Sequence, residues 1–248
     1  MNFLSLFKRN LIYKFKKKID IDLEKLDHLS LDDLFLHFGT DKSNSKKNEE
    51  LNAHGYTNFY KKHLDSFKNK QIKILEIGAF SGASAAAFAK YFPNSEIYCI
   101  DINISNFKYQ SKKIHVFGIN SSDNKMVLKF LEKINFYESI KHFDIIIDDG
   151  SHKLSDQLNA LNFFYKLVAK GGFYIIEDYK FPNYFEHLND VNDIKIDELI
   201  KKVNQRVEFS SSLISINTIN DLISTNKKIY EYKGNTDISN ISFFEKKI

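Results

Sequence analysis

The stretch KILEIGAFSGASAAAFAK, residues 73–90, decides the fold that this sequence predicts. It starts as an apolar run, turns through a segment with two glycines, and continues into small residues that suit a helix packed closely on a sheet. Gly78 permits a tight turn, and Gly82 lets the backbone come close to a ligand. A strand, turn and helix of this kind open a parallel sheet, which binds ligands beside the carboxyl ends of its strands.

The same alternation continues along the chain. Apolar runs typical of strands lie at 72–77, 96–101, 114–117, 143–148 and 172–177. Helical patterns lie between them at 82–92, 124–137 and 153–169. This alternation predicts an α/β fold, a Rossmann-like doubly wound and mostly parallel sheet with helices on both faces. A helix near 194–204 and two later β-like runs, at 206–216 and 228–233, predict that the sheet ends in an antiparallel pair.

The residues before this alternation predict a separate helical region. Their patterns indicate helices at 3–19, 29–38 and 57–68 and a polar loop at 41–54. The second helix starts at the cap-like Ser30 and ends before Gly39. We therefore expect an N-terminal helical region at 1–70 and the doubly wound domain at 71–248.

Composition excludes several classes of protein. With 43% hydrophobic and 27% charged residues, the 248-residue chain has the composition of a globular protein. It has no apolar run long enough to span a bilayer, and residues 1–20 do not form a secretory signal. The single cysteine, Cys99, indicates a reducing compartment, so we expect a cytoplasmic protein. The net charge of +4 comes from lysine, since arginine occurs only at Arg9 and Arg206, and we expect no nucleic-acid partner.

The turn after the first strand does not fit a dinucleotide. In the fingerprint G-x-G-x-x-G counted from Gly78, the second and third glycines fall on Phe80 and Ala83. Phe80 stands where the backbone must approach a pyrophosphate. Glu76 repels phosphates but suits a cationic aminoacyl group, and Asp101, at the end of the second strand, can accept hydrogen bonds from ribose hydroxyls. The set favours a nucleoside cofactor without a pyrophosphate.

Carboxylates also follow the fourth and fifth predicted strands. Asp149 follows one strand, and Glu177 and Asp178 end the other, so we expect them to converge at one edge of the sheet. A hard cation such as Mg²⁺ or Mn²⁺ relieves their mutual repulsion. The alternative interpretation is helix capping, for which Asp149 and Ser151 are suitable. His152 is a candidate general base, because histidine ordinarily titrates near neutral pH.

These residues together resemble one family. The resemblance rests on Phe38-Gly39-Thr40-Asp41-Lys42, His54-Gly55-Tyr56, Glu76–Gly82, Ile100-Asp101, Asp148-Asp149-Gly150-Ser151-His152 and Glu177-Asp178. Over residues 35–180 the chain resembles the class I S-adenosylmethionine-dependent methyltransferases, specifically the metal-dependent sugar O-methyltransferases related to macrocin and mycinamicin O-methyltransferases. The DDGSH and ED elements are distinctive, whereas the glycine turn alone would identify only the superfamily. The resemblance implies a seven-stranded methyltransferase sheet with a terminal antiparallel strand.

The resemblance also implies roles for individual residues. Contacts to S-adenosylmethionine are implied for Glu76, Gly78, Gly82, Asp101, Asn120, Ser121, Asp148, Lys42 and Tyr56. Asn120 stands in a loop where family members often carry an acid, and its amide can still hydrogen-bond adenine. Lys42, Tyr56 and the neighbouring His54 are expected to close over the cofactor or the substrate. Metal binding, to Mg²⁺ or Mn²⁺, is implied for Asp149, Glu177 and Asp178, and catalysis for Asp149 and His152, with His152 as the base.

The expected activity is metal-assisted O-methylation of a sugar hydroxyl. The expected acceptor is a nucleotide-linked sugar, such as a heptose for bacterial capsule or surface polysaccharide. One alternative is another small acceptor, such as a phosphoramidate or a phosphate. A second alternative is a scaffold with a degenerate methyltransferase fold at the inner face of the membrane, because the basic amphipathic segment 3–19 suits anionic lipid. Packing of that segment on its own domain, or on a partner in a homo-oligomer, is equally open.

Overall fold

The computed structural model describes residues 3–45 and 53–248, so the middle of the predicted loop 41–54 lies outside the described residues. Contacts between residues divide the chain into two compact units. The first comprises Met1–Asn120 and Gly234–Asp237, and the second comprises Ser121–Lys233 and Ile238–Ile248. We describe each unit by itself.

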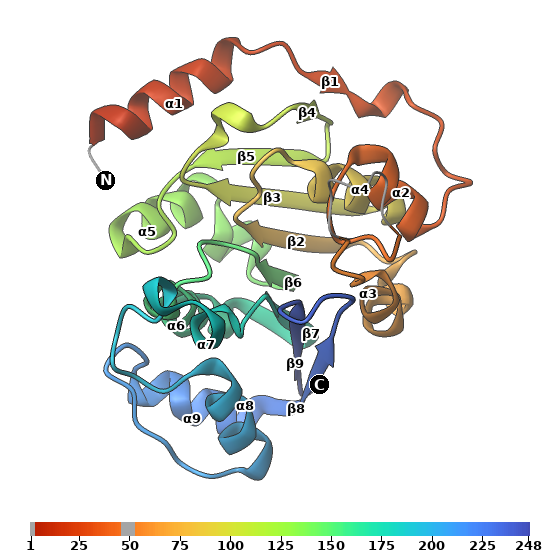
Figure 1. Cartoon of the computed structure of the whole chain (residues 1–248). Coiled ribbons are helices and arrows are strands. Elements are labelled where there is room, and N and C mark those ends of the chain that lie inside the picture. Colours follow the sequence, from red (N-terminus) through yellow and green to blue (C-terminus); the bar gives the residue numbers. More distant parts are fainter. Residues whose placement is uncertain (1–2, 46–52) are drawn as a thin grey trace. The chain divides into compact units, whose positions relative to one another are not determined.

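Three parallel strands form the main sheet of the first unit, in the order β5-β3-β2 (Figure 1). They are β2 (Ile72–Ile77), β3 (Ser95–Asp101) and β5 (Ile114–Gly118). Ile77 lies opposite Ile100, and Asp101 lies opposite Gly118, so the three carboxyl ends share one edge. A shorter parallel pair joins β1 (Ile19–Asp20) to β4 (Tyr109–Gln110). The predicted strands of this half are confirmed to within a residue.

The helices of the first unit also follow the predicted pattern. They are α1 (Phe3–Phe15), α2 (Leu31–Phe38), α3 (Thr57–Leu64) and α4 (Ala83–Tyr91). In α2 the Ser30 hydroxyl accepts from the Asp33 backbone and the Asp33 carboxylate accepts from the Ser30 backbone, while Gly39 ends the helix at φ 78°. The predicted helix at 3–19 is too long, because Ile19 already pairs in β1. Among the described residues, no helix is long and apolar enough to cross a membrane.

An aromatic cluster joins the early helices to the sheet-covering helix. Phe35 of α2 and Tyr60 of α3 both pack on Phe88 of α4, with ring centroids 5.4 and 5.3 Å away. Burial of three large rings stabilises this contact by several kcal/mol, at about 2 kcal/mol each. These contacts place α2 and α3 in one core with α4, and the division at 1–70 and 71–248 stays a prediction.

The second unit combines parallel and antiparallel pairing, in the order β6-β7-β9-β8. Its strands are β6 (Phe143–Asp148), β7 (Val168–Glu177), β8 (Asn226–Lys233) and β9 (Asn240–Lys246). Its helices are α5 (Asn124–Lys133), α6 (Leu154–Phe164), α7 (Phe181–Tyr184), α8 (Ile196–Gln205) and α9 (Ile216–Thr225). β7 runs parallel to β6 and antiparallel to β9. The predicted α/β class, a mostly parallel sheet of seven strands that ends in an antiparallel pair, is confirmed.

Three expected boundaries in this unit are wrong. The helix predicted at 153–169 stops at Phe164, because Val168 pairs with Phe143 in the sheet. The helix predicted at 124–137 stops at Lys133 and is followed by a five-residue π-helical turn. No strand forms at 206–216, where Ser211 and Ser212 instead donate to the Asp193 carboxylate and Ser215 caps α9. The partner of β8 is β9, at 240–246.

Candidate active site

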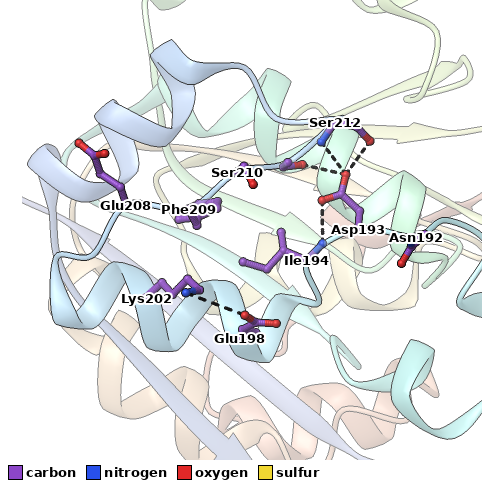
Figure 2. A pocket seen from close by; sticks show the side chains of 10 residues that line it. Asn192, Asp193, Ile194, Glu198, Lys202, Glu208, Phe209, Ser210 and Ser212 are labelled. Carbon is purple, nitrogen blue, oxygen red and sulfur yellow. Dashed lines mark hydrogen bonds and ion pairs between the residues drawn. The ribbon is translucent and has the colours of Figure 1, made fainter.

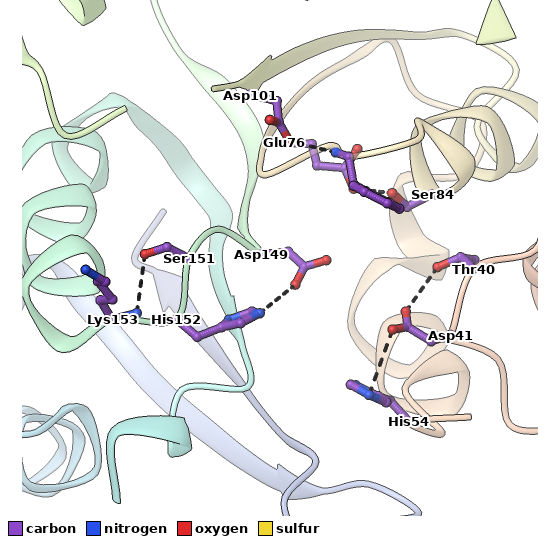
Figure 3. Close-up of polar contacts among 11 residues, drawn as sticks. Thr40, Asp41, His54, Glu76, Ser84, Asp101, Asp149, Ser151, His152 and Lys153 are labelled. Carbon is purple, nitrogen blue, oxygen red and sulfur yellow. Dashed lines mark hydrogen bonds and ion pairs between the residues drawn. The ribbon is translucent and has the colours of Figure 1, made fainter. Parts of the chain in front are cut away.

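Glu76, a predicted cofactor residue of the first unit, is fully buried. It lies one residue before the end of β2, and its side chain is 0% exposed. The hydroxyl of Ser84, in the first turn of α4, donates to Glu76 Oε1 (Figure 3). The thiol of Cys99, from β3, lies 4.0 Å from Glu76 Oε2. A carboxylate held below the turn in this way can attract a cationic group, and its partners fix the direction of its oxygens.

The Asp101 carboxylate lies beside the turn and accepts hydrogen bonds from two backbone N–H groups. Its Oδ2 accepts a hydrogen bond of 2.8 Å from the Phe80 backbone N–H, and its Oδ1 accepts one of 2.6 Å from the Asn103 N–H. Figure 3 shows the carboxylate beside the turn. Each carboxylate oxygen has a second lone pair, so Asp101 can still accept from the two hydroxyls of a ribose.

The backbone of the turn depends on left-handed residues. Gly78 has φ 87°, Phe80 φ 40° and Gly82 φ 76°, and the Phe80 side chain is exposed. A Cβ at Gly82 would lie 2.4 Å from Cζ of Phe107. Gly82 therefore makes room for the Phe107 ring. The sequence alone suggests only that this glycine makes room for a ligand.

The residues predicted to cover the cofactor lie in two segments of the first unit that are joined by backbone hydrogen bonds. Tyr56 N–H donates to the Lys42 carbonyl over 2.9 Å, and Gly55 N–H donates to the Ser43 carbonyl over 2.9 Å. The side chains of Lys42 and Tyr56 are buried. His54 Nε2 lies 3.9 Å from Asp41 Oδ2 (Figure 3). The His54 ring also packs edge-on against Tyr56. Their contacts to a cofactor stay a prediction.

The predicted adenine loop begins at the end of β5. Asn120 lies two residues beyond Gly118 and is partly exposed, and the Ile119 N–H is bonded to the Asp101 carbonyl over 3.0 Å. Ser121 is also partly exposed and begins the second unit. The roles of Asn120 and Ser121 stay predictions.

In the second unit, three predicted residues form a cluster that can hold a metal ion. Asp149, His152 and Asp178 each offer one ligand atom, and these atoms all lie within 4.8 Å of one another. His152 Nε2 is 3.8 Å from Asp149 Oδ1 (Figure 3). Asp149 follows β6 and Asp178 follows β7, so adjacent parallel strands bring the groups together. The two carboxylates supply the oxygen ligands that a divalent ion such as Mg²⁺ or Mn²⁺ prefers, whereas the imidazole of His152 is not a preferred ligand of such hard ions.

Two members of this cluster have strained backbone conformations. His152 has φ 57° and Asp178 has φ 51°, in the left-handed region that non-glycine residues rarely adopt. The Asp178 N–H donates to the Asn240 carbonyl over 2.6 Å. Such conformations cost about 1–3 kcal/mol each and persist only where surrounding contacts determine them.

Asp156 is a supporting residue that the sequence reasoning missed. Its Oδ1 accepts from Ser122 over 2.5 Å, and its Oδ2 accepts from the Ser151 hydroxyl. It thereby ties the first turn of α6 to the residue before His152. A carboxylate five residues after a serine carries no distinctive sequence signal, so only the folded loop reveals this contact.

Glu177 and Asp148 are buried beside the cluster and are not members of it. Glu177 is the last residue of β7, and Asp148 is the last residue of β6. The pKa of Asp148 is raised to about 7, mainly by burial and also by the neighbouring Asp149, while hydrogen bonds from the Gly150 backbone and Tyr174 act in the opposite direction. The predicted roles of Glu177 as a metal ligand and Asp148 as a cofactor contact stay predictions.

A hollow in the second unit is lined by residues outside the predicted site. It has a volume of about 770 Å³ and is lined by Asn192, Asp193, Ile194, Glu198, Lys202, Glu208, Phe209, Ser210, Ser211 and Ser212. Figure 2 shows Asp193 bonded to Ser212 and to the backbone of Ile194, and Lys202 beside Glu198. No predicted site residue lines it, and the carboxylate of Asp193 is already used by the loop.

Comparison with known proteins shows similarity to methyltransferases. The family described as a methyltransferase domain matches residues 75–179. The chain is 29% identical over 155 residues to L-olivosyl-oleandolide 3-O-methyltransferase of Streptomyces antibioticus, which covers 60% of this chain and 36% of that protein. It is 30% identical over 132 residues to mycinamicin VI 2''-O-methyltransferase of Micromonospora griseorubida, which covers 50% of this chain and 31% of that protein. The alignments thus span about a third of each relative's length.

The fold is also similar to that of a solved methyltransferase. The solved structure of the MycE methyltransferase from the mycinamycin biosynthetic pathway, in complex with Mg, SAH and mycinamycin VI, matches with a TM-score of 0.66 at 21% identity. The match covers 88% of this chain and 55% of that chain. Residues 75–179 therefore match a methyltransferase domain, the fold is that of a solved methyltransferase, and the chain resembles the macrocin and mycinamicin type of sugar O-methyltransferase.

Proposed function

We propose that the protein is an S-adenosylmethionine-dependent, divalent-metal-assisted O-methyltransferase that acts on a sugar hydroxyl. The observation that carries this proposal is the cluster of Asp149, His152 and Asp178 at the ends of two parallel strands in a chain with a methyltransferase domain. The names of the two relatives describe methylation of sugar or macrolide hydroxyls, which supports an oxygen acceptor.

The residues of the first unit are assigned to the cofactor. Glu76 would attract the cationic aminoacyl end, Asp101 would accept from the ribose, and the turn at Gly78 and Gly82 would leave room for the nucleoside. Asn120, Ser121, Asp148, Lys42 and Tyr56 complete the proposed contacts. When bound, S-adenosylmethionine supplies an activated methyl group on a sulfonium sulfur.

The residues of the second unit are assigned to the metal and the acceptor. Asp149 and Asp178, with Glu177 beside them, would hold Mg²⁺ or Mn²⁺, which supplies positive charge that orients the acceptor hydroxyl and lowers its pKa. His152 would take the proton of the acceptor hydroxyl at a ring nitrogen, so that the acceptor oxygen can receive the methyl group. Alignment and exclusion of water are the protein's other contributions.

Substitutions in the cluster test the catalytic roles. His152→Ala and Asp149→Asn are each expected to lower the rate of labelled methyl transfer by at least about 100-fold, because they remove the base or a metal ligand. Binding of S-adenosylhomocysteine, measured by calorimetry, is expected to change little. His142→Ala, an exposed histidine before β6, is the matched control and keeps its activity. Full activity in excess chelator would contradict the metal role.

For the acceptor, we propose a nucleotide-linked sugar, such as a heptose for bacterial capsule or surface polysaccharide. The labelled-methyl assay over a panel of nucleotide sugars, phosphoramidates and macrolide glycosides separates this from the other acceptors. Transfer only to a phosphate or phosphoramidate oxygen would replace the sugar proposal. The proposed location is the cytoplasm, at the inner face of the membrane, and homo-oligomerisation is a further open proposal. A chain that binds cofactor but methylates nothing in the panel would favour the scaffold alternative.

A further inference from the structure

One face of α1 fastens the helix to its own unit. Leu6 is buried, and Tyr13 packs edge-on against Phe107 with ring centroids 6.1 Å apart. Asn10 Nδ2 donates to the Gly118 carbonyl over 3.1 Å, and Lys16 Nζ donates to the Ser105 carbonyl over 2.9 Å. These contacts fix the side of α1 that carries Leu6, Asn10 and Tyr13 against the first unit. The opposite side of the helix therefore faces away from these contacts.

The opposite face of α1 is apolar and exposed. Leu4 is 70% exposed, Phe7 59%, Leu11 45% and Phe15 77%. At 100° per residue these positions fall within one narrow stripe, away from Leu6 and Tyr13. Four large apolar side chains in a row are unusual on the surface of a monomer and indicate an interaction site. None of them takes part in the proposed methyl transfer.

The charge around the stripe is entirely basic. Residues 1–19 contain no Asp or Glu. Lys8 and Lys14 are exposed and lie on either side of the stripe, and Lys17 is exposed just beyond the helix. Lysines in this position can extend their ammonium groups to phosphates while their methylene stems cover apolar surface.

We propose that the outer face of α1 docks on an anionic lipid surface, with Leu4, Phe7, Leu11 and Phe15 in the acyl boundary and Lys8 and Lys14 among the headgroup phosphates. Charge complementarity selects this occupant. Pairing of the same face with a second copy of the chain would bring two basic helices together with no acidic residue between them. The docking goes beyond the proposed methyl transfer and does not depend on it.

Vesicle flotation of the full chain tests the docking. We expect the protein to float with vesicles that contain phosphatidylglycerol and to stay unbound with phosphatidylcholine alone. Phe7→Ser/Leu11→Ser/Phe15→Ser is expected to reduce the bound fraction by at least about tenfold, since it removes most of the inserted apolar area. Lys8→Glu/Lys14→Glu is expected to abolish the preference for anionic lipid, and high salt to weaken binding by the wild type.

Two controls keep the result specific. Leu128→Ser removes an apolar side chain that is 44% exposed on α5, and it is expected to leave flotation unchanged. An unaltered thermal unfolding midpoint, expected because Phe7, Leu11 and Phe15 are largely exposed, would show that the triple variant still folds. Equal flotation of wild type and triple variant overturns the proposal. The proposal is also overturned if the wild type binds no vesicles and forms a dimer, measured by light scattering, while the triple variant is monomeric. Methyl transfer is not the readout, so failure here leaves the proposed activity standing.

Discussion

At the scale of single residues, strained backbone marks the ends of the strands that carry the predicted site. Phe80, His152 and Asp178 are non-glycine residues with positive φ, and they follow β2, β6 and β7 respectively. Each strained residue is a predicted site residue or stands within a predicted site segment. Strain of about 1–3 kcal/mol per residue is retained only where neighbouring contacts hold it, and Asp101 and Asn240 supply such contacts for Phe80 and Asp178.

Gly82→Ala measures how tightly the cofactor turn is packed. We expect it to lower the free energy of unfolding by about 3 kcal/mol or more, because a Cβ would meet Phe107 at 2.4 Å as well as strain the left-handed backbone. Gly39→Ala is the matched control, since Gly39 has φ 78° and nothing within 4 Å of its added Cβ. Its expected loss is about 1 kcal/mol. Equal losses in urea unfolding of the two variants would contradict the role of Phe107.

Asp156→Ala tests whether the missed carboxylate positions His152. We expect kcat to fall about tenfold with little change in affinity for S-adenosylhomocysteine, because release of Ser151 lets the loop before His152 move. Asp190→Ala removes a different carboxylate, which accepts from Ser155 in the first turn of α6, and serves as control. An unchanged kcat in Asp156→Ala, with Mn²⁺ affinity also unchanged, would exclude the positioning role.

At the scale of elements, local signals predict helices and parallel strands better than the polar segments between them. The Ser30 cap and the Gly39 stop place α2, and the apolar runs place β2, β3 and β6. The segment 206–216 has β-like composition but lacks a strand partner, because its serines bond to Asp193 instead. Arg206, at φ 60°, ends α8 and turns the chain into this loop.

The loop around Asp193 predicts a pH effect on stability. Burial tends to raise the pKa of Asp193, but hydrogen bonds from Ser212, Ser211 and the Ile194 backbone lower it below its ordinary value. A lowered folded-state pKa means that the stabilisation is present above the unfolded pKa, near 4, and is lost as pH falls through the folded pKa. Asp193→Asn is therefore expected to destabilise by about 1 kcal/mol at pH 7 and by less at about pH 3.

Urea unfolding at the two pH values checks this expectation. Glu198→Gln is the control, because Glu198 lines the same hollow but pairs only weakly with Lys202, at 4.0 Å. A difference between wild type and Asp193→Asn that stays the same at both pH values would show that the carboxylate charge is not what the loop uses.

At the scale of the whole molecule, one unit carries the turn that suits a nucleoside and the other carries the cluster that suits a metal. The basic, apolar face of α1 adds a third surface, on the first unit. The chain spans about a third of the two curated relatives, so the proposals concern what these 248 residues contain. The proposed methyl transfer and the proposed docking of α1 together predict an acceptor that is made at a membrane.

The sequence by itself predicted the α/β class, the turn at Gly78, the carboxylate ligands Asp149, Glu177 and Asp178, and His152 as a base. It could do so because strand and helix periods, glycine conformations and side-chain chemistry are local properties. Only the tertiary structure decided that Asp149, His152 and Asp178 share a site, with Asp156 supporting the loop, while Glu177 stands outside the group. It also decided that β8 pairs with 240–246, and that the apolar stripe of α1 faces outward while Leu6 and Tyr13 face the fold. These outcomes depend on contacts between residues far apart in the chain, which no local pattern encodes.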